Sequence, residues 1–149
     1  MSESDLIKLY SDRILALATD IPRQDRLADP DATVRKRAPL CGSTITVDVK
    51  VKDGKVADYG QEVRACALGQ AAASIVGGAV IGQTSDQVHA ARDSLKAMLK
   101  EGGPVPPAPF DGLEVLSPAS EYKNRHASIM LSLDALCEAM EKAAQSDCA

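Results

Sequence analysis

The sequence has almost no aromatic residues: 149 residues include three tyrosines, one phenylalanine and no tryptophan. The core must therefore be aliphatic and rich in alanine. Long apolar runs are also missing, since the longest nearly uncharged stretch, residues 71–82, falls well short of the roughly 20 residues that span a bilayer. The first five residues are acidic and polar, without the positive start and apolar stretch of a secretory signal. These absences predict a cytoplasmic protein with no membrane contact.

An excess of positive charge is absent as well. The net charge is −4, which does not favour binding to nucleic acid or to anionic lipid, and the one basic cluster, Arg35-Lys36-Arg37, is typical of a solvated strand edge. No glycine-rich phosphate loop follows a predicted strand, and no Ser/His/Asp or Cys/His catalytic order is recognisable. The sequence therefore does not predict an enzyme.

The chain does contain four cysteines, which in a cytoplasmic protein are interpreted as thiols or metal ligands rather than disulfides. Two of them, Cys41 and Cys66, flank a predicted β-hairpin. Residues 44–52 alternate strictly between apolar and polar side chains, as in a strand with one buried face, and Asp53-Gly54 is a strong turn signal before the returning strand, residues 55–65. Because a hairpin returns its two ends to one place, both thiols can share one ion.

The chemistry of the cysteines differs with their setting. Cys66 stands at the predicted start of a helix, where the helix dipole favours a thiolate, and Gly42 gives the loop of Cys41 room to bend. Two cysteines at this separation are also compatible with, and more often found as, small buried apolar residues. Cys137 lies beside the apolar stripe of the last helix and is assigned to the core, and Cys148 is next to the C-terminus. Neither is a candidate ligand.

The remaining patterns predict one α+β domain over residues 1–149, with a three-stranded antiparallel sheet and helices packed on one of its faces. Residues 33–39 are expected to form an edge strand, and Gly60 is expected to mark a β-bulge. Helices are predicted in the first twenty residues, after Cys66, after an N-cap at Thr84, and from about Arg125 onward. Glycines and prolines at 102–109 predict a stiff connector.

Two histidines complete the set of candidate ligands. His89 lies one step from the apolar stripe of its predicted helix and is interpreted as a surface or boundary residue. His126 stands at the start of the last helix, in the segment Asn124-Arg125-His126-Ala127-Ser128. A capping or surface role and a ligand role are both open for His126.

At these residues the chain resembles the U-type iron–sulfur cluster assembly scaffolds, the family of IscU, SufU and the N-terminal domain of NifU. The motifs that carry the resemblance are Ala38-Pro39-Leu40-Cys41-Gly42, Cys66 followed by Gln70-Ala71-Ala72-Ala73-Ser74, and Gly82-Gln83-Thr84. The resemblance implies a scaffold-like or sulfur-accepting protein that binds an iron–sulfur cluster, iron or zinc. It also implies that a cysteine desulfurase and iron–sulfur acceptor proteins are its partners.

Carried over position by position, the family's ligand pattern falls on Cys41, Ser43, Cys66 and Ser128, so a serine stands where the family has its third cysteine. The resemblance implies that His126 can replace the missing ligand and form a site with Cys41 and Cys66. A homodimer that shares one cluster between two chains is a further open arrangement. The alternative function is a divergent interaction or regulatory module that keeps the fold without a metal.

Overall fold

A three-stranded antiparallel sheet forms the base of the computed structural model, which describes residues 12–39 and 42–147. The strands β1 (Ala32–Arg37), β2 (Thr44–Lys52) and β3 (Lys55–Arg64) lie in the order β1-β2-β3. The predicted hairpin is confirmed: Asp53 and Gly54 join β2 to β3 and both have positive φ, 55° and 76°, as a tight hairpin turn requires.

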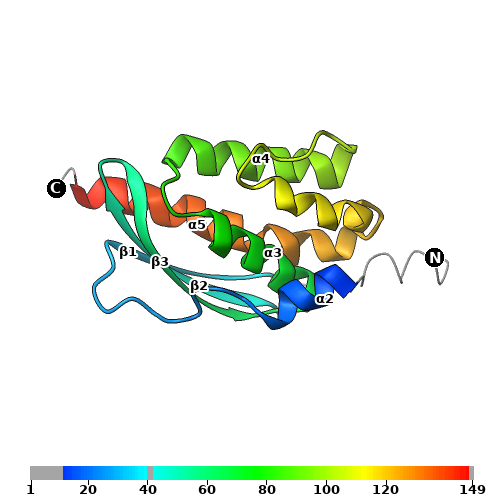
Figure 1. Cartoon of the computed structure of the whole chain (residues 1–149), viewed down its shortest axis with the longest axis horizontal. Coiled ribbons are helices and arrows are strands. Elements are labelled where there is room, and N and C mark those ends of the chain that lie inside the picture. The colour runs from blue at the N-terminus through cyan, green and yellow to red at the C-terminus, as the bar shows by residue number, and fades with distance from the viewer. Residues whose placement is uncertain (1–11, 40–41, 148–149) are drawn as a thin grey trace.

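Helices cover one face of this sheet, as predicted. The helix α2 (Asp12–Thr19) precedes the sheet, and α3 (Ala67–Ala79) and α5 (His126–Asp147) pack against it. A second layer of helix, α4 (Ser85–Glu101), lies on the side of α5 away from the strands (Figure 1). The predicted connector is followed by two 3₁₀ segments that the sequence patterns do not indicate, η1 (Asp111–Glu121) and η2 (Lys123–Arg125).

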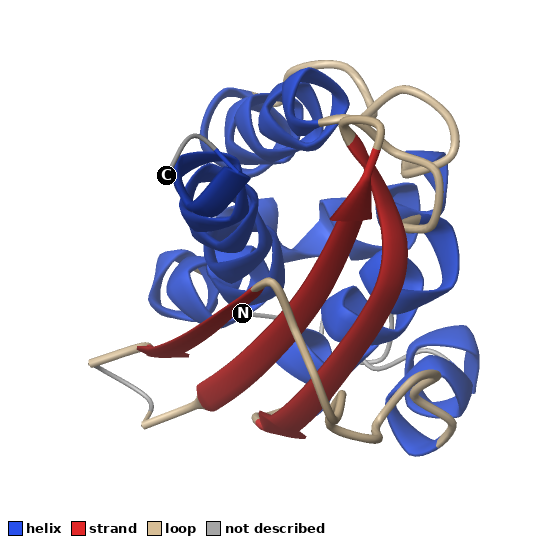
Figure 2. Ribbon diagram, turned by 90° about the vertical axis from the view of Figure 1, so that its left-hand side faces the viewer, coloured by secondary structure: helices blue, strands red, loops and turns tan. Residues whose placement is uncertain are grey.

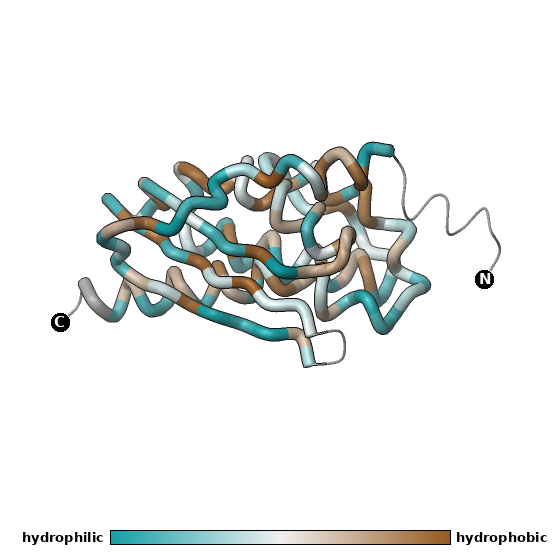
Figure 3. Tube along the Cα trace, turned by 90° about the horizontal axis from the view of Figure 1, so that it is seen from below, coloured by the Kyte–Doolittle hydropathy of each residue, from teal (hydrophilic) through white to brown (hydrophobic). Residues whose placement is uncertain are grey.

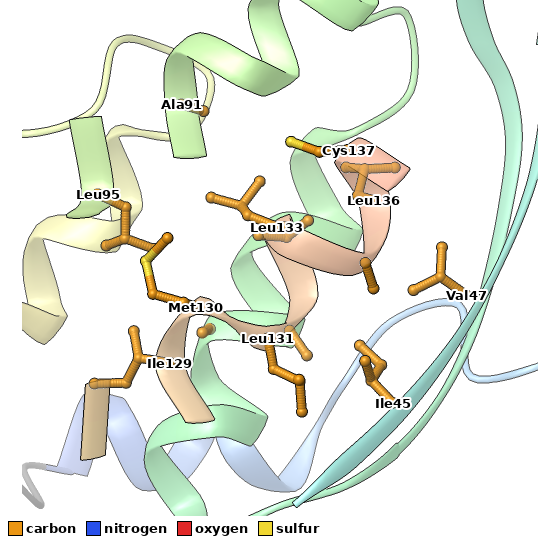
Figure 4. Close-up of a cluster of buried hydrophobic side chains, with 14 of the residues drawn as sticks. Ile45, Val47, Ala91, Leu95, Ile129, Met130, Leu131, Leu133, Leu136 and Cys137 are labelled. Atoms are coloured by element: carbon orange, nitrogen blue, oxygen red, sulfur yellow. The ribbon is translucent and has the colours of Figure 1, made fainter. Parts of the chain in front are cut away.

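The core lies between the layers, with α5 at its centre. Figure 4 shows Leu133 of α5 among the buried side chains, with Ile45 and Val47 of β2 on the sheet side and Leu95 of α4 on the opposite side. The strands alternate between hydrophilic and hydrophobic residues along their length (Figure 3), so their apolar side chains face the helices. The helix α5 is therefore buried on two sides, against the sheet and against α4.

The ends of α4 have the predicted capping residues. Thr84 Oγ1 accepts a hydrogen bond from Gln87 N at 3.2 Å, and Gln87 Oε1 accepts one from Thr84 N at 2.8 Å, which completes a capping box. Gly102 ends the helix in the left-handed conformation, with φ 66°.

The outer face of the sheet is only partly exposed, which corrects the expectation that β2 has one buried face. Asp48, a polar position of β2, is fully buried because the segment from α2 to β1 runs across the strands (Figure 2). Its carboxylate accepts hydrogen bonds from Arg26 Nε at 2.6 Å, from Thr33 Oγ1 at 2.6 Å and from Leu27 N at 3.1 Å.

The β-bulge lies three residues from its expected place. The register of β2 and β3 shifts where Lys50 pairs with Asp58 and Val51 pairs with Val56, so Ala57 is the extra residue. Gly60 pairs regularly with Asp48, and a Cβ at this glycine would collide with the backbone carbonyl of Asp25. A close approach of the crossing segment, rather than a bulge, requires glycine at position 60. Across residues 12–39 and 42–147, no helix combines the length and the hydrophobicity needed to span a bilayer.

Candidate functional site

The candidate site lies at the end of the sheet where β2 begins and β3 ends. Thr44 and Arg64 pair across these two strands, so the residues just outside the pair, Ser43 and Cys66, come to the same end of the sheet. The first turn of α5 reaches this end and contributes Ser128. Three segments that are far apart in the sequence therefore meet here.

Ser128 is the centre of this cluster. Its Oγ lies 3.1 Å from Ser43 Oγ and 3.4 Å from Cys66 Sγ, and in each pair either atom can donate the proton. The two serines are buried, with 4% of Ser43 and 1% of Ser128 exposed, whereas Cys66 is intermediate in exposure. We refer to Ser43, Cys66 and Ser128 as the Ser-Cys cluster.

Local structure at the start of α3 directs the thiol into this cluster. Cys66 is the N-cap of α3, as predicted, with extended backbone angles of −66° and 169°, and its side chain makes no capping hydrogen bond. Gly69 lies one turn later, and a Cβ at this position would collide with Ser128 Oγ. The starts of α3 and α5 can approach each other this closely because position 69 has no side chain.

A buried glutamine also supports this end of the molecule. Gln61 of β3 faces the helices, where its Nε2 donates to the carbonyl of Pro22 at 2.9 Å and to that of Ala73 at 3.2 Å. It links the crossing segment, the sheet and α3. Neither Gln61 nor Gly69 is recognisable as important from the sequence, although an amide at a core-facing strand position is a signal that could have identified Gln61.

His126 is placed differently from the cluster. It is the first residue of α5 and is 7% exposed, and its Nε2 lies 3.0 Å from the carbonyl oxygen of Ala119 and 3.2 Å from that of Ser120. Two carbonyl oxygens around one ring nitrogen require Nε2 to carry the proton and donate. In this conformation Nε2 is therefore not a metal donor, and the ring connects α5 to the end of η1.

The described donors do not complete a metal site by themselves. Cys41 lies outside the described residues, so its place relative to Cys66 stays a prediction. Among residues 12–39 and 42–147, no three His, Cys, Asp or Glu side chains are grouped so that they could hold a metal ion. The Ser-Cys cluster supplies one thiol and two hydroxyls, and neutral hydroxyls are poor substitutes for thiolates toward zinc or iron.

Cations flank the cluster on neighbouring strands. Arg37 of β1 pairs with Thr44 of β2, which in turn pairs with Arg64 of β3, so two arginines lie at the same end of the sheet as Cys66. The side chain of Arg64 is 81% exposed. Its guanidinium pairs with Glu62 at 3.8 Å, so its charge is partly balanced.

Comparison with protein families gives a match over most of the chain. The family model described as the NifU-like N-terminal domain matches residues 9–140. The chain is 26% identical over 134 residues to the iron–sulfur cluster assembly scaffold protein IscU of Thermotoga maritima, covering 90% of this chain and 94% of that protein. It is 25% identical over 146 residues to the protein of the same name from Streptococcus pyogenes serotype M1, covering 98% of this chain and 91% of that protein.

Solved structures with the same architecture agree with this match. The crystal structure of a nitrogen-fixing NifU-like protein (N-terminal) from Brucella abortus has a TM-score of 0.92 and 42% identity, covering 95% of this chain and 98% of that one. An iron–sulfur cluster assembly scaffold of the SUF system from Fervidobacterium islandicum AW-1, so described, has a TM-score of 0.79 and 18% identity, covering 90% of this chain and 98% of that one. The second likeness shows the shared fold alone.

Proposed function

This chain belongs to the family of NifU-like N-terminal domains, and from that membership we propose that it acts as an iron–sulfur cluster assembly scaffold or sulfur acceptor, not as an enzyme. Its cargo, an iron–sulfur cluster, iron or zinc, binds at Cys41 and Cys66. The observation that carries the proposal is the convergence of Ser43, Cys66 and Ser128, because the hairpin ends and the first turn of α5 meet around a thiol. Cys41 precedes Ser43 by two residues, which limits the separation of their α-carbons to about 7 Å.

Sulfur transfer needs only one accessible thiol. In the proposed step, the Cys66 thiolate attacks the outer sulfur of a persulfide on a cysteine desulfurase, a new S–S bond forms on Cys66, and the desulfurase cysteine leaves as a thiolate. The step is redox-neutral overall. The intermediate exposure of Cys66 supports it, since the thiol is reachable. Iron–sulfur acceptor proteins receive the assembled cargo.

His126 enters the proposal as an exchangeable third ligand. Coordination through Nε2 requires the ring to leave the carbonyls of Ala119 and Ser120, whereas coordination through Nδ1 leaves those hydrogen bonds in place. A neutral imidazole in place of a thiolate makes a cluster less reducing.

Metal content tests the proposal. Protein purified without chelator is expected to hold about one equivalent of zinc or iron per chain. Cys41→Ser and Cys66→Ser should each remove most of it, and His126→Ala should weaken its retention without abolishing binding. Cys137→Ser is the matched control, because this cysteine is buried in the core away from the cluster. Wild-type protein that takes up less than about a tenth of an equivalent would refute cargo binding.

A second candidate function is a metal-free interaction or regulatory module on the same fold. The hydrogen bond between Ser43 Oγ and Ser128 Oγ favours it, because both buried hydroxyls have a protein partner. The substitution Ser128→Cys separates the two candidates. If cargo binds here, a thiolate at position 128 should raise the iron and sulfide content per chain after reconstitution, together with the visible charge-transfer absorption. A folded Ser128→Cys variant that gains neither would support the metal-free module.

A further inference from the structure

A cleft on the far side of α5 from the sheet is lined by an unusual share of cations. It has a volume of about 820 Å³, within the range of small-molecule sites, and it lies between α4, the 3₁₀ segments and the first half of α5. We call it the basic cleft, and its cations are Arg92, Lys96, Lys100 and Lys123.

These cations are arranged in a row and largely lack partners. Arg92, Lys96 and Lys100 are four residues apart on α4, so they share one face and extend over about 12 Å, with Lys123 contributed by η2. Arg92 pairs with its neighbour Asp93 at 3.2 Å. In the described part of the chain, no carboxylate oxygen lies within 4.0 Å of the ammonium group of the three lysines.

The charge of the basic cleft contrasts with that of the whole chain. Asp93 and Asp134 are the two carboxylates of its lining, so the cations outnumber them, in a protein of net charge −4. Burial raises the pKa of Asp134, although Lys36, Arg92 and Lys96 act in the opposite direction. Concentrating cations in one concave surface favours an anion there.

The rest of the lining is mixed. Ser120 and His126 are polar, Ala127 is apolar and exposed, and Leu99 of α4 and Met130 of α5 contribute little surface because they are 2% and 8% exposed. The alkyl stems of the lysines add apolar surface. A bare inorganic ion would leave this apolar surface unused. Ala127 is followed directly by Ser128, whose Oγ contacts Cys66. A ligand in the basic cleft would therefore touch the same turn of α5 that carries part of the Ser-Cys cluster.

We propose that the basic cleft binds a small organic anion that has at least two phosphate or carboxylate groups on an apolar body. Its acidic groups pair with Lys96, Lys100 and Lys123, and its body rests on Ala127 and on the alkyl stems of these lysines. The site is separate from the Ser-Cys cluster, although His126 lines it, and it needs no metal.

Titration of the metal-free full chain, followed by backbone amide NMR at constant ionic strength, tests this proposal. Three probes separate the sources of charge: benzene-1,3,5-tricarboxylate offers carboxylates on an apolar ring, ADP offers phosphates on a purine, and pyrophosphate offers charge alone. At least one organic probe is expected to give saturable shifts confined to residues 92–100 and 120–134, with tighter binding than pyrophosphate.

The variant Lys96→Glu/Lys100→Glu should weaken that binding by at least about tenfold, because two charge-assisted contacts become repulsive. Lys142→Glu, an exposed lysine of α5 outside the basic cleft, is the matched control and should bind as wild type does. If the charge reversal impairs folding, Lys96→Gln/Lys100→Gln provides a milder test, which should also weaken binding of the organic probe.

Three results would overturn the proposal. One is the absence of cleft-confined shifts for both organic probes at about 10 mM, a concentration that detects even weak sites. Another is unchanged binding in the lysine variants. The third is stronger binding of hexaglutamate than of either organic probe, which would assign the basic cleft to an acidic protein segment. Because no metal is present, none of these results depends on cargo binding at Cys66.

Discussion

Two cysteines of this chain differ in chemistry because of where the fold places them. Cys66 is of intermediate exposure at the start of α3, with its sulfur 3.4 Å from Ser128 Oγ. Cys137 is 1% exposed in the core, and burial raises the pKa of its thiol to about 12. A thiolate is the reactive form, so this shift suppresses the reactivity of Cys137 roughly a thousandfold relative to an ordinary cysteine.

We therefore expect iodoacetamide to modify Cys66 much faster than Cys137 in folded, metal-free protein at pH 7. Mass spectrometry of proteolytic peptides at successive times measures the two rates separately. In denaturant the two rates should become similar, which serves as the control. Faster labelling of Cys137 than of Cys66 in the folded protein would contradict the described placement of both residues.

At the scale of the elements, a pH-dependent contact between His89 of α4 and Glu141 of α5 links the two helices. His89 Nε2 lies 2.9 Å from Glu141 Oε1, and His89 Nδ1 lies 2.7 Å from the carbonyl oxygen of Ser85. The hydrogen bond to Ser85 and then the one to Glu141 raise the pKa of His89. Protonated His89 thus stabilises the folded state, and this contribution is complete below the ordinary histidine pKa of about 6.5.

The contribution should disappear as pH rises through the folded-state pKa of His89, which lies above that ordinary value. We expect Glu141→Gln to lower the free energy of unfolding at pH 6 by less than about 1 kcal/mol, since the pair is partly exposed, and to have a smaller effect at pH 8. Urea unfolding at both values measures this difference. Glu121→Gln, an exposed position on η1, is the control. An equal effect of Glu141→Gln at both pH values would refute the pairing.

For the whole molecule, the segment from α2 to β1 covers part of the outer face of the sheet and is held there through Asp48. Burial by itself would raise the pKa of this carboxyl, but hydrogen bonds from Arg26, Thr33 and Leu27 outweigh burial and lower it. The charged form is therefore favoured in the folded state. Its stabilising effect is present above the ordinary aspartate pKa of about 3.9 and is lost as pH falls through the lower folded-state value.

We expect Asp48→Asn to lower the free energy of unfolding at pH 7 by about 2 kcal/mol, because a buried charged acceptor loses its hydrogen bonds from Arg26, Thr33 and Leu27. The difference from wild type should shrink toward pH 3. Chemical denaturation across this range measures it, and Asp29→Asn, an exposed position in the same segment, is the matched control. If both variants were equally stable at pH 7, Asp48 would not hold the crossing segment in place.

The sequence by itself determined the elements whose signals are local. Alternation with a period of two and the Asp53-Gly54 turn specify the hairpin, and Thr84 with Gln87 and Gly102 delimit α4, because these preferences act within a few residues of the chain. The placement of Cys66 at the start of α3 follows from the same kind of signal. The motifs around Cys41 and Cys66 also identified the family, since such a resemblance depends on which residues follow one another along the chain and not on their contacts in the fold.

Only the tertiary structure decided what depends on distant segments. Three features arise where segments far apart in the sequence come into contact: the burial of Asp48, the requirement for glycine at position 60 and the close approach of Gly69 to Ser128. The periodicity of apolar residues does not predict such contacts. The orientation of His126 toward η1 also depends on tertiary structure. The carbonyls that accept its hydrogen bonds belong to a 3₁₀ segment that the sequence patterns do not indicate. The basic cleft likewise exists because packing brings Lys123 to the face of α4 that carries Lys96 and Lys100.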